Sequence, residues 1–215
     1  MSRAVLFCNG EIGDLGYHQA LLKEDDFIIA VDGGGCFCHA MDLKPQIAIG
    51  DFDSLPPALA AYFEAQETKL IPFPADKNYI DLVLAIEEAR KRGFDDILIL
   101  GALGGKRADM HMGNILCLSA YDKKGEKIVI KNEFSEISFL REGFPFAFQG
   151  EIGNYVSLIP LSDVVETGLS RNLKYQLKGL VFQRGETRSI SNELTATEGE
   201  LLLVRGNAII IIQKG

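Results

Sequence analysis

Unbroken apolar runs of strand length recur through the first part of the chain. A strand that is half-exposed alternates apolar and polar residues, whereas a strand covered on both faces of a parallel sheet is apolar throughout. Segments of helical pattern at 56–66, 79–92 and about 109–120 separate these runs, and strand–helix alternation predicts an open, mostly parallel α/β sheet. The runs lie at residues 4–8, 27–31, 47–49, 69–73 and 96–100.

The pattern changes near residue 133. Beyond that point no convincing helix appears, and short β-rich runs are separated by Gly, Asn and Asp, which predicts a small all-β sandwich or barrel. We therefore expect an α/β domain at 1–133 and a β domain at 134–215, with Glu166-Thr167-Gly168 in a loop. The β-rich runs lie at 137–139, 155–161, 177–182, 201–204 and 208–212.

Composition limits the class of protein. The chain has 215 residues, of which 47% are hydrophobic and 24% charged, as in folded globular proteins. A net charge of −8 disfavours a nucleic-acid partner. No apolar run is long enough to span a membrane and the first run is too short for a secretory signal, so we expect a cytoplasmic protein. The four cysteines fit neither a disulfide framework nor a zinc site, and the three histidines, His18, His39 and His111, are expected to be structural.

The segment Gly50-Asp51-Phe52-Asp53-Ser54 follows the third apolar run. If the strand continued through it, Asp51 and Asp53 would point the same way, because side chains in a strand alternate with period two. Two such carboxylates repel each other unless a cation lies between them, and Mg²⁺ binds carboxylates together with substrate phosphates. The segment predicts a metal–phosphate site; the alternative is a polar turn after a strand.

Residues suited to phosphate chemistry follow all five predicted strands. Ligands of open α/β sheets bind at the carboxyl ends of the strands, where these segments meet. Glycines let the backbone approach phosphates, and carboxylates and cations supply metal ligands and counter-charges, which is typical of phosphoryl transfer. The P-loop motif is absent. The segments are Asn9-Gly10, Asp32 to Gly35, Asp51 to Ser54, Asp76 to Asn78 with Asp81, and Gly101 to Asp109.

At these residues the chain resembles the thiamine pyrophosphokinase family, over nearly its whole length and with the motifs in the family's order. The G-D-F-D-S motif is intact at 50–54. The motifs D-G-G, D-x-x-x-T-D, G-G-R-x-D, L-K-[WY] and S-N resemble Asp32 to Gly34, Asp76 to Asp81, Gly104 to Asp109, Leu173 to Tyr175 and Ser191-Asn192, respectively.

The resemblance implies transfer of a pyrophosphoryl group from ATP to the thiamine hydroxyl, with release of AMP. It also implies Mg²⁺, and a homodimer whose active sites lie between the α/β domain of one subunit and the β domain of the other. The site residues it implies are catalytic Asp53, Asp81, Lys77 and Arg107; metal ligands Asp51, Asp53 and Asp81; nucleotide contacts Asn9, Asp32, Gly33, Gly34, Ser54, Gly104, Gly105, Lys106 and Asp109; and thiamine contacts Tyr175, Ser191 and Asn192.

Three residues depart from the family pattern. Ile80 replaces the usual Thr beside Asp81, Lys106 is inserted before Arg107, and Gln176 stands where bacterial members often have Pro. Two alternative functions stay open, the first because a D-x-D pair also occurs in other Mg²⁺-dependent enzymes and the second because of Ile80. One is another Mg²⁺-dependent enzyme, a phosphotransferase, phosphohydrolase or nucleotidyl-sugar transferase. The other is a non-catalytic thiamine or nucleotide sensor, with Ile80 marking lost activity.

Overall fold

The protein is represented by a computed structural model, which describes residues 2–74, 76, 78–121 and 125–215. The chain forms two compact units. The first comprises residues 1–117 and 123–133, and the second comprises residues 118–122 and 134–215. The first is an α/β unit and the second is built from antiparallel strands, which confirms the predicted fold class.

Six parallel strands form the sheet of the first unit. Their bounds are β1 Ala4–Phe7, β2 Phe27–Val31, β3 Ile47–Gly50, β4 Lys69–Pro72, β5 Asp96–Leu100 and β6 Lys127–Lys131. Their order is β6-β5-β1-β2-β3-β4, and every pairing is parallel. The central strands β1, β2, β3 and β5 are buried almost throughout, which explains why their sequences do not alternate. Sequence analysis did not identify β6, although Ile128 to Ile130 is an apolar run.

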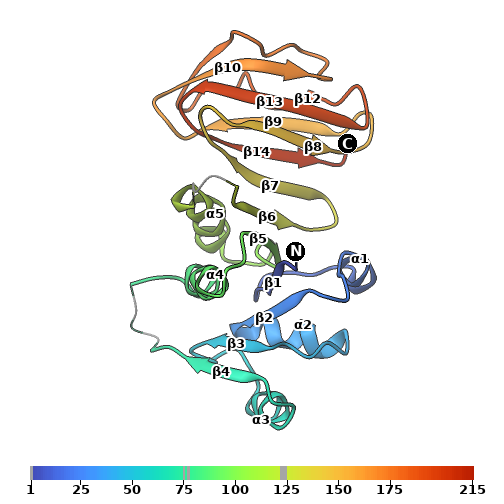
Figure 1. The fold of residues 1–215 in the computed structure, drawn as a ribbon, viewed down its shortest axis with the longest axis vertical. Helices are drawn as coiled ribbons and strands as arrows, with labels where there is room; N and C mark the ends of the chain where they lie inside the picture. Colours follow the sequence, from blue (N-terminus) through green and yellow to red (C-terminus); the bar gives the residue numbers. More distant parts are fainter. Residues whose placement is uncertain (1, 75, 77, 122–124) are drawn as a thin grey trace. The chain divides into compact units, whose positions relative to one another are not determined.

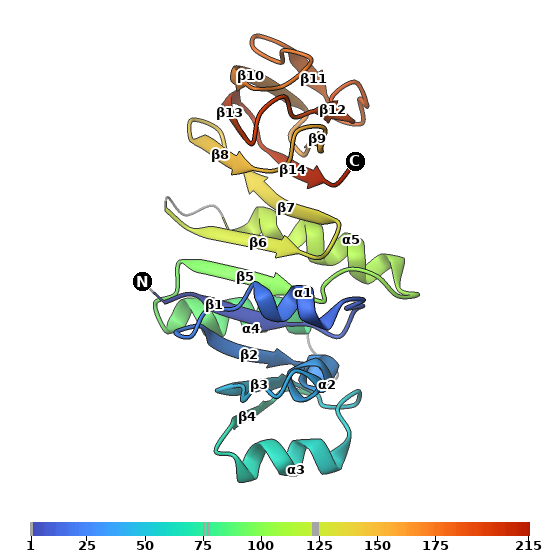
Figure 2. The same cartoon turned by 90° about the vertical axis from the view of Figure 1, so that its right-hand side faces the viewer.

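Helices cover both faces of this sheet. Figure 1 shows α4 and α5 on one side and α1 and α2 on the other, and Figure 2 shows the strands along their length. The bounds are α1 Leu15–Ala20, the 3₁₀ turn η1 Asp32–Gly34, α2 Gly35–Ala40, α3 Pro57–Ala65, α4 Asp81–Lys91 and α5 Ala108–Cys117.

Helix α4 shows how the sequence sets a helix against the sheet. Leu82, Ala85, Ile86 and Ala89 are buried and lie three or four residues apart, so they form one apolar stripe. On the polar side, Arg90 forms ion pairs with two glutamates. The helix ends before Gly93, whose φ of 88° is the left-handed conformation that glycine adopts at helix ends.

The second unit consists of two antiparallel layers. One has the order β12-β9-β14-β7 and the other β11-β10-β13-β8. Their inward side chains form one apolar core, which includes Phe148, Leu158, Phe182 and Ile210. The short 3₁₀ turn η2, Leu118–Ala120, also belongs to this unit. The bounds are β7 Ser135–Leu140, β8 Pro145–Gln149, β9 Tyr155–Pro160, β10 Val164–Arg171, β11 Val181–Gln183, β12 Asn192–Glu193, β13 Glu198–Arg205 and β14 Ala208–Gln213.

The expectation of a loop at Glu166-Thr167-Gly168 is wrong, because these residues lie inside β10. The pairing of β10 with β13 is irregular at this point, with register shifts on both sides of Thr167. Thr167 is fully buried and its hydroxyl donates a hydrogen bond to the Leu177 carbonyl. Gly168 packs so closely against Val204 that a Cβ would lie 2.3 Å from it. Glycine here marks a bulged strand rather than a loop.

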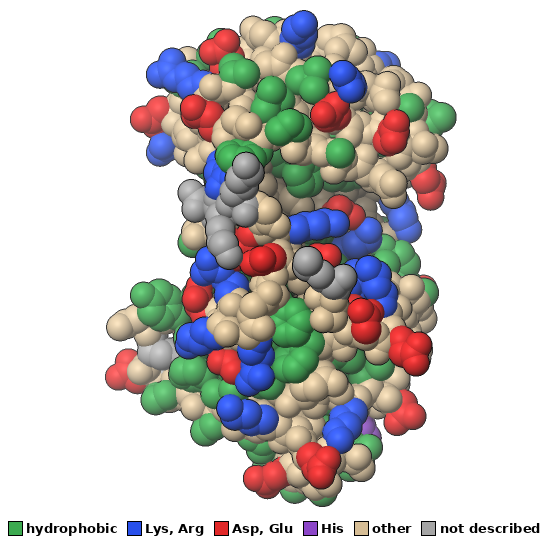
Figure 3. All heavy atoms as spheres, viewed as in Figure 1, with side chains coloured by type: hydrophobic (Ala, Val, Ile, Leu, Met, Phe, Trp, Pro, Cys, Tyr) green, Lys and Arg blue, Asp and Glu red, His purple; other side chains and the backbone are tan. Residues whose placement is uncertain are grey.

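No helix among the residues that the structure describes is long and apolar enough to cross a membrane. On the face drawn in Figure 3, the Lys and Arg side chains are interspersed with Asp and Glu. That face therefore carries no large field of a single sign.

We expect Gly34→Ala to destabilise the first unit by about 3 kcal/mol or more. A Cβ at Gly34 would lie 1.8 Å from the carbonyl oxygen of Phe7, and backbone atoms of a buried strand cannot move aside cheaply. Urea unfolding followed by circular dichroism measures the loss. Gly113→Ala is the matched control: no atom lies within 4 Å of its added Cβ, so it should stabilise α5 by about 0.5–1 kcal/mol. Equal stability of the two variants would contradict this account of Gly34.

Candidate active site

A cleft of about 360 Å³ opens at the carboxyl ends of the strands in the first unit. Segments that follow β1, β2, β3 and β5 line it, together with the first residues of α4 and one face of α5. The predicted convergence is therefore present for four of the five strand-end segments and for Asp81, whereas Asp76 and Asn78, which follow β4, are not part of the lining. The predicted site residues that line the cleft are Asn9, Asp32, Asp51, Asp53, Ser54, Asp81, Gly104, Gly105, Lys106 and Arg107.

Three further predicted residues of the first unit do not line the cleft, and a fourth is not described by the structure. Gly33 and Gly34 are buried beneath the loop that follows β1 and are not part of the cleft lining. Asp109 is exposed and also lies outside the lining. Lys77 is outside the residues that the structure describes.

Close backbone contact joins the loop after β1 to the loop after β5. The Gly10 N–H donates a hydrogen bond of 2.6 Å to the Gly101 carbonyl, and the Glu11 N–H donates one of 2.8 Å to the Leu103 carbonyl. A Cβ at Gly10 would lie 2.4 Å from the Gly101 oxygen, so a larger residue would separate the two loops. These contacts fix two walls of the cleft.

Gly33 and Gly34 allow close packing at the end of β1. A Cβ at Gly33 would lie 2.2 Å from the side-chain oxygen of Asn9, and one at Gly34 would meet the Phe7 carbonyl. The turn η1 can therefore lie directly against β1 and the loop after it. This placement positions Asp32, whose φ of 50° is in the left-handed region, at the edge of the cleft.

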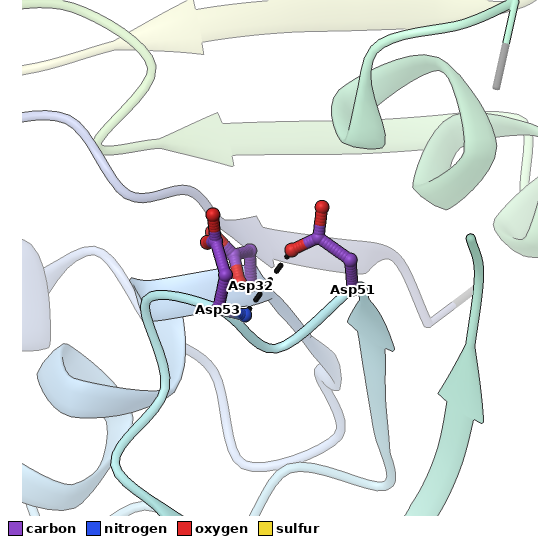
Figure 4. A group of neighbouring side chains, drawn as sticks. All are labelled: Asp32, Asp51 and Asp53. Carbon is purple, nitrogen blue, oxygen red and sulfur yellow. Dashed lines mark hydrogen bonds between the residues drawn. The ribbon is translucent and has the colours of Figure 1, made fainter. Parts of the chain in front are cut away.

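Three carboxylates converge in this cleft. Asp32, Asp51 and Asp53 each offer a carboxylate oxygen within 4.8 Å of the others. Figure 4 shows the three side chains on the same side of the two loops that carry them. Gly50 makes the approach possible, because a Cβ there would lie 3.1 Å from the Cα and Cβ of Asp32.

Asp51 and Asp53 do approach each other, but the prediction that strand alternation aligns them is wrong. Strand β3 ends at Gly50, so strand alternation does not extend through this segment. Phe52 has a φ of 61°, and the Asp53 N–H donates a hydrogen bond of 3.1 Å to the Asp51 carboxylate, drawn as the dashed line in Figure 4. A tight turn thus brings the carboxylates together, as the side-chain bonding of Asp in turns allows.

The electrostatics of this group favour a cation. Burial raises the pKa of the Asp32 carboxyl, and the negative charges of Asp53 and Asp51 raise it further. The Oδ1 atom of Asp32 is buried and accepts no hydrogen bond from any residue in the described part of the chain. Asp53 accepts a 2.8 Å hydrogen bond from the Ser54 hydroxyl. Hard carboxylate oxygens in this arrangement are the ligands that Mg²⁺ prefers, so the residues fit that ion.

Asp81 lies on the cleft wall but is not a member of this acidic group. Within the described ranges, the structure thus groups Asp32 with Asp51 and Asp53, where sequence analysis had grouped Asp81 with them. Asp81 is the first residue of α4, and Ile80 is its N-cap, with no side-chain capping bond. A hydroxyl at position 80 would be an N-cap, so the departure from the family pattern removes a helix cap beside Asp81.

The glycine-rich loop carries two cationic side chains, Arg107 and Lys106, with different partners. Arg107 pairs with Asp109 through two hydrogen bonds of 2.9 and 2.6 Å, and both side chains are exposed. The hydrogen bond from Arg107 lowers the pKa of Asp109 to about 2, so the pair is ionised at neutral pH. Lys106 is exposed on the cleft lining and forms no ion pair with a residue that the structure describes.

His111 is a cleft residue that sequence analysis assigned to structure alone. Its Nε2 lies 2.5 Å from the Gly104 carbonyl oxygen. A carbonyl only accepts hydrogen bonds, so Nε2 carries the proton and donates. His111 therefore holds the glycine-rich loop against α5. Its position one helical turn after Arg107 was the available signal, since residues four apart share a helix face.

Cys8 lines the cleft with a buried thiol. Burial raises the pKa of Cys8 well above its usual range, and burial raises that of Cys117 to about 12. Burial likewise raises the pKa of Cys38, and the four cysteines are unbridged, as expected.

The three predicted thiamine contacts lie in the second unit. Asn192 is buried and its side chain is committed to the backbone of Tyr175: Oδ1 accepts from the Tyr175 N–H at 3.0 Å and Nδ2 donates to the Tyr175 carbonyl at 2.7 Å. Tyr175 itself is 61% exposed. Ser191 has a φ of 59°, and its N–H donates to the hydroxyl of Ser157 at 3.0 Å. Asn192 therefore positions Tyr175, while Tyr175 and Ser191 are accessible.

Comparison with known proteins gives one consistent result. A family model described as "Thiamin pyrophosphokinase, catalytic domain" matches residues 18–130, and one described as "Thiamin pyrophosphokinase, vitamin B1 binding domain" matches residues 147–202. A thiamine pyrophosphokinase of Bacillus subtilis (strain 168) is 32% identical over 183 residues, which are 85% of this chain and 85% of that protein.

Solved structures of thiamine pyrophosphokinases are also similar to this chain. The thiamine pyrophosphokinase of Bacillus subtilis superposes with a TM-score of 0.85 at 28% identity, covering 100% of both chains. That of Geobacillus thermodenitrificans gives 0.84 at 26% identity, covering 100% of this chain and 98% of that one. The enzyme from Candida albicans, 19% identical with a TM-score of 0.80 over 100% of this chain and 89% of its own, shares the fold.

We expect Asp32→Asn to raise the melting temperature in metal-free buffer at pH 7 by about 2–4 °C. The pKa of Asp32 is raised in the folded chain, so its contribution to stability is present in acid and is lost as the pH rises through that pKa. At pH 7 the ionised group opposes folding, and the amide removes that repulsion.

Mg²⁺ should raise the melting temperature of the unsubstituted chain more than that of Asp32→Asn, because the ion relieves the same repulsion. Differential scanning calorimetry with EDTA or MgCl₂ measures both effects. Asp25→Asn, at an exposed residue outside the cleft, is the control and should respond to Mg²⁺ as the unsubstituted chain does. An identical Mg²⁺ response in Asp32→Asn would exclude Asp32 from the metal site.

Proposed function

We propose that ATP donates the pyrophosphoryl group that this chain transfers to thiamine, because the chain belongs to the thiamin pyrophosphokinase family and is a thiamine diphosphokinase. In this reaction the thiamine hydroxyl oxygen bonds to the β-phosphorus of ATP. The bond from that phosphorus to the α–β bridging oxygen breaks, the hydroxyl loses its proton, and AMP leaves. The products are thiamine diphosphate and AMP.

The single observation that carries this proposal is the convergence of an acidic group and a glycine-rich basic loop in one cleft. Asp32, Asp51 and Asp53 form one group in the lining, and Lys106 and Arg107 belong to the loop after β5. Phosphoryl transfer depends on positioning and on neutralising phosphate charge, and this set of residues supplies both.

We assign Asp32, Asp51 and Asp53 as the residues that would hold Mg²⁺. When bound, the ion supplies charge neutralisation to the phosphate oxygens. The donor set fits, since the buried Oδ1 of Asp32 accepts no hydrogen bond within the described part of the chain. We keep Asp81 as a catalytic carboxylate, because it lines the same cleft outside the acidic group.

The rest of the loop positions the nucleotide. The backbones of Gly104 and Gly105, with φ of 80° and 91°, let phosphate oxygens approach closely, as a side chain there would not. His111 keeps the Gly104 carbonyl turned toward α5 and away from those oxygens. Lys106 and Arg107 contribute the positive charge.

We expect Asp53→Asn to lower turnover at least about 100-fold while leaving the fold intact, because it removes a negative ligand from the acidic group. The assay incubates protein, ATP, MgCl₂ and thiamine and separates the products by chromatography. AMP and thiamine diphosphate in equal amounts support the proposed reaction, whereas ADP would indicate transfer of a single phosphoryl group. Tight binding without turnover would instead identify a sensor. Asp25→Asn should keep full activity; wild-type turnover by Asp53→Asn would remove Asp53 from the site.

We expect Arg107→Ala to weaken binding of a non-hydrolysable ATP analogue about tenfold and to leave thiamine binding unchanged, because Arg107 is assigned to the phosphates. Lys106→Ala is the matched comparison on the same loop. Titration calorimetry with each ligand separates the two. If Lys106→Ala loses affinity and Arg107→Ala does not, Lys106 is the phosphate contact and Arg107 serves only its pair with Asp109.

We further propose that the chain acts as a homodimer in which the second unit of one subunit supplies thiamine contacts to the first unit of the other. The exposed ring of Tyr175, which can stack on the cationic thiazolium of thiamine, supports this assignment of the second unit.

The homodimer predicts that Tyr175→Ala and Asp53→Asn chains, each poorly active alone, regain activity after mixing and subunit exchange. A mixed dimer carries both substitutions in one site and leaves the other site intact. Exchange is verified by mass spectrometry of differently tagged chains. Failure to regain activity after verified exchange would show that each site belongs to one chain.

A further inference from the structure

The cleft contains a buried acceptor that the proposed reaction does not use. Asn114, on α5, lines the cleft and is only 6% exposed. Its Nδ2 donates a 2.8 Å hydrogen bond to the Ala102 carbonyl. Its Oδ1 is buried and has no hydrogen-bond partner among the residues that the structure describes.

The orientation of this amide is fixed. The Ala102 carbonyl can only accept, so the NH₂ group must face it, and a flipped amide would place two oxygens against each other. The helix backbone is also held at this point, because the Cys117 thiol donates to the Asn114 carbonyl at 3.1 Å. A buried acceptor without a donor costs free energy, so this oxygen is suited to a donor that enters from the cleft.

Two observations limit which ligand group can donate to the Oδ1 of Asn114. Phosphate oxygens carry few or no protons at neutral pH, so the ligand group is not phosphate. Two residues of the lining beside Asn114 are apolar: Met110, one helical turn earlier on α5, and Ala102, its hydrogen-bond partner. His111, on the same face of α5, also lines the cleft, and its Nε2 already donates to the Gly104 carbonyl. An acceptor flanked by Met110 and Ala102 suits a flat heteroaromatic ring that carries an exocyclic amine.

We propose that Asn114 is a specificity-determining residue, whose Oδ1 accepts a hydrogen bond from the 6-amino group of adenine. The inference rests on the proposed use of ATP. Guanine and hypoxanthine carry an oxygen at that position, which would face the Oδ1 of Asn114, and two acceptors cannot form a hydrogen bond. The site therefore selects adenine nucleotides. The aminopyrimidine of thiamine carries the same kind of amine and is the competing source. With the phosphates at the glycine-rich loop, the base would lie in the same cleft against Ala102 and Met110.

The test combines a change in the ligand with a change in the protein. Dissociation constants and kcat/KM are measured for ATP and for purine riboside 5′-triphosphate, which lacks only the amine. The variants are Asn114→Ala and Asn114→Leu; leucine is close in size and keeps the packing if alanine unfolds the helix. Met112→Ala, at a 59% exposed residue of the same helix, is the control.

The unsubstituted chain and Met112→Ala should prefer ATP by about tenfold in both binding and kcat/KM. Either Asn114 variant should lose that preference through weaker handling of ATP, with the amine-free analogue unchanged. The preference for ATP over ITP should fall in parallel.

An equal loss for both nucleotides, or an unchanged preference, would overturn the proposal. A thiamine analogue without its amine supplies the other arm: loss of discrimination for thiamine alone would assign Asn114 to thiamine. If the unsubstituted chain neither binds nor uses a purine nucleotide, the proposed function is wrong. If it uses ATP but does not discriminate against the amine-free analogue, only the role of Asn114 is wrong.

Discussion

Direct contact between backbones at the carboxyl ends of the strands is the constraint on which the cleft depends. Gly34 lies against the Phe7 carbonyl, Gly10 against the Gly101 carbonyl, and Gly50 against the Cα of Asp32. A Cβ at any of these positions would meet backbone atoms at 3.1 Å or less. The loops can therefore converge only because these residues have no side chain, and the convergence places acids, cations and glycines in one cleft.

Convergence has an electrostatic cost. Three carboxylates within 4.8 Å repel one another, and the buried Oδ1 of Asp32 accepts no hydrogen bond from the residues that the structure describes. A sequence selected for stability alone would not keep such a group, because removing one charge would relieve it. The retained repulsion is consistent with a site that gains stability when a cation binds.

The sequence predicted the sheet, the two-part organisation and the segments that meet at the cleft, because buried parallel strands and strand-end polar residues leave strong patterns. It misjudged features set by tertiary contacts. Asp32 joins Asp51 and Asp53 because Gly50 admits its backbone, and sequence spacing carries no sign of that. His111 and Asn114 were missed because a polar residue on a helix has the same sequence pattern whether it faces solvent or a cleft. Gly168 was misread because glycine marks both loops and bulged strands.

The buried thiol of Cys8 has a consequence for how the protein can be handled. Only a thiolate reacts readily with alkylating agents or disulfides, and burial raises the pKa of Cys8 so that almost none is present at neutral pH. A cysteine on the cleft wall would ordinarily make a site sensitive to peroxide and to disulfide exchange. Here the same burial that packs Cys8 into the cleft wall keeps its sulfur protonated, which makes this thiol a poor target for alkylation and disulfide exchange.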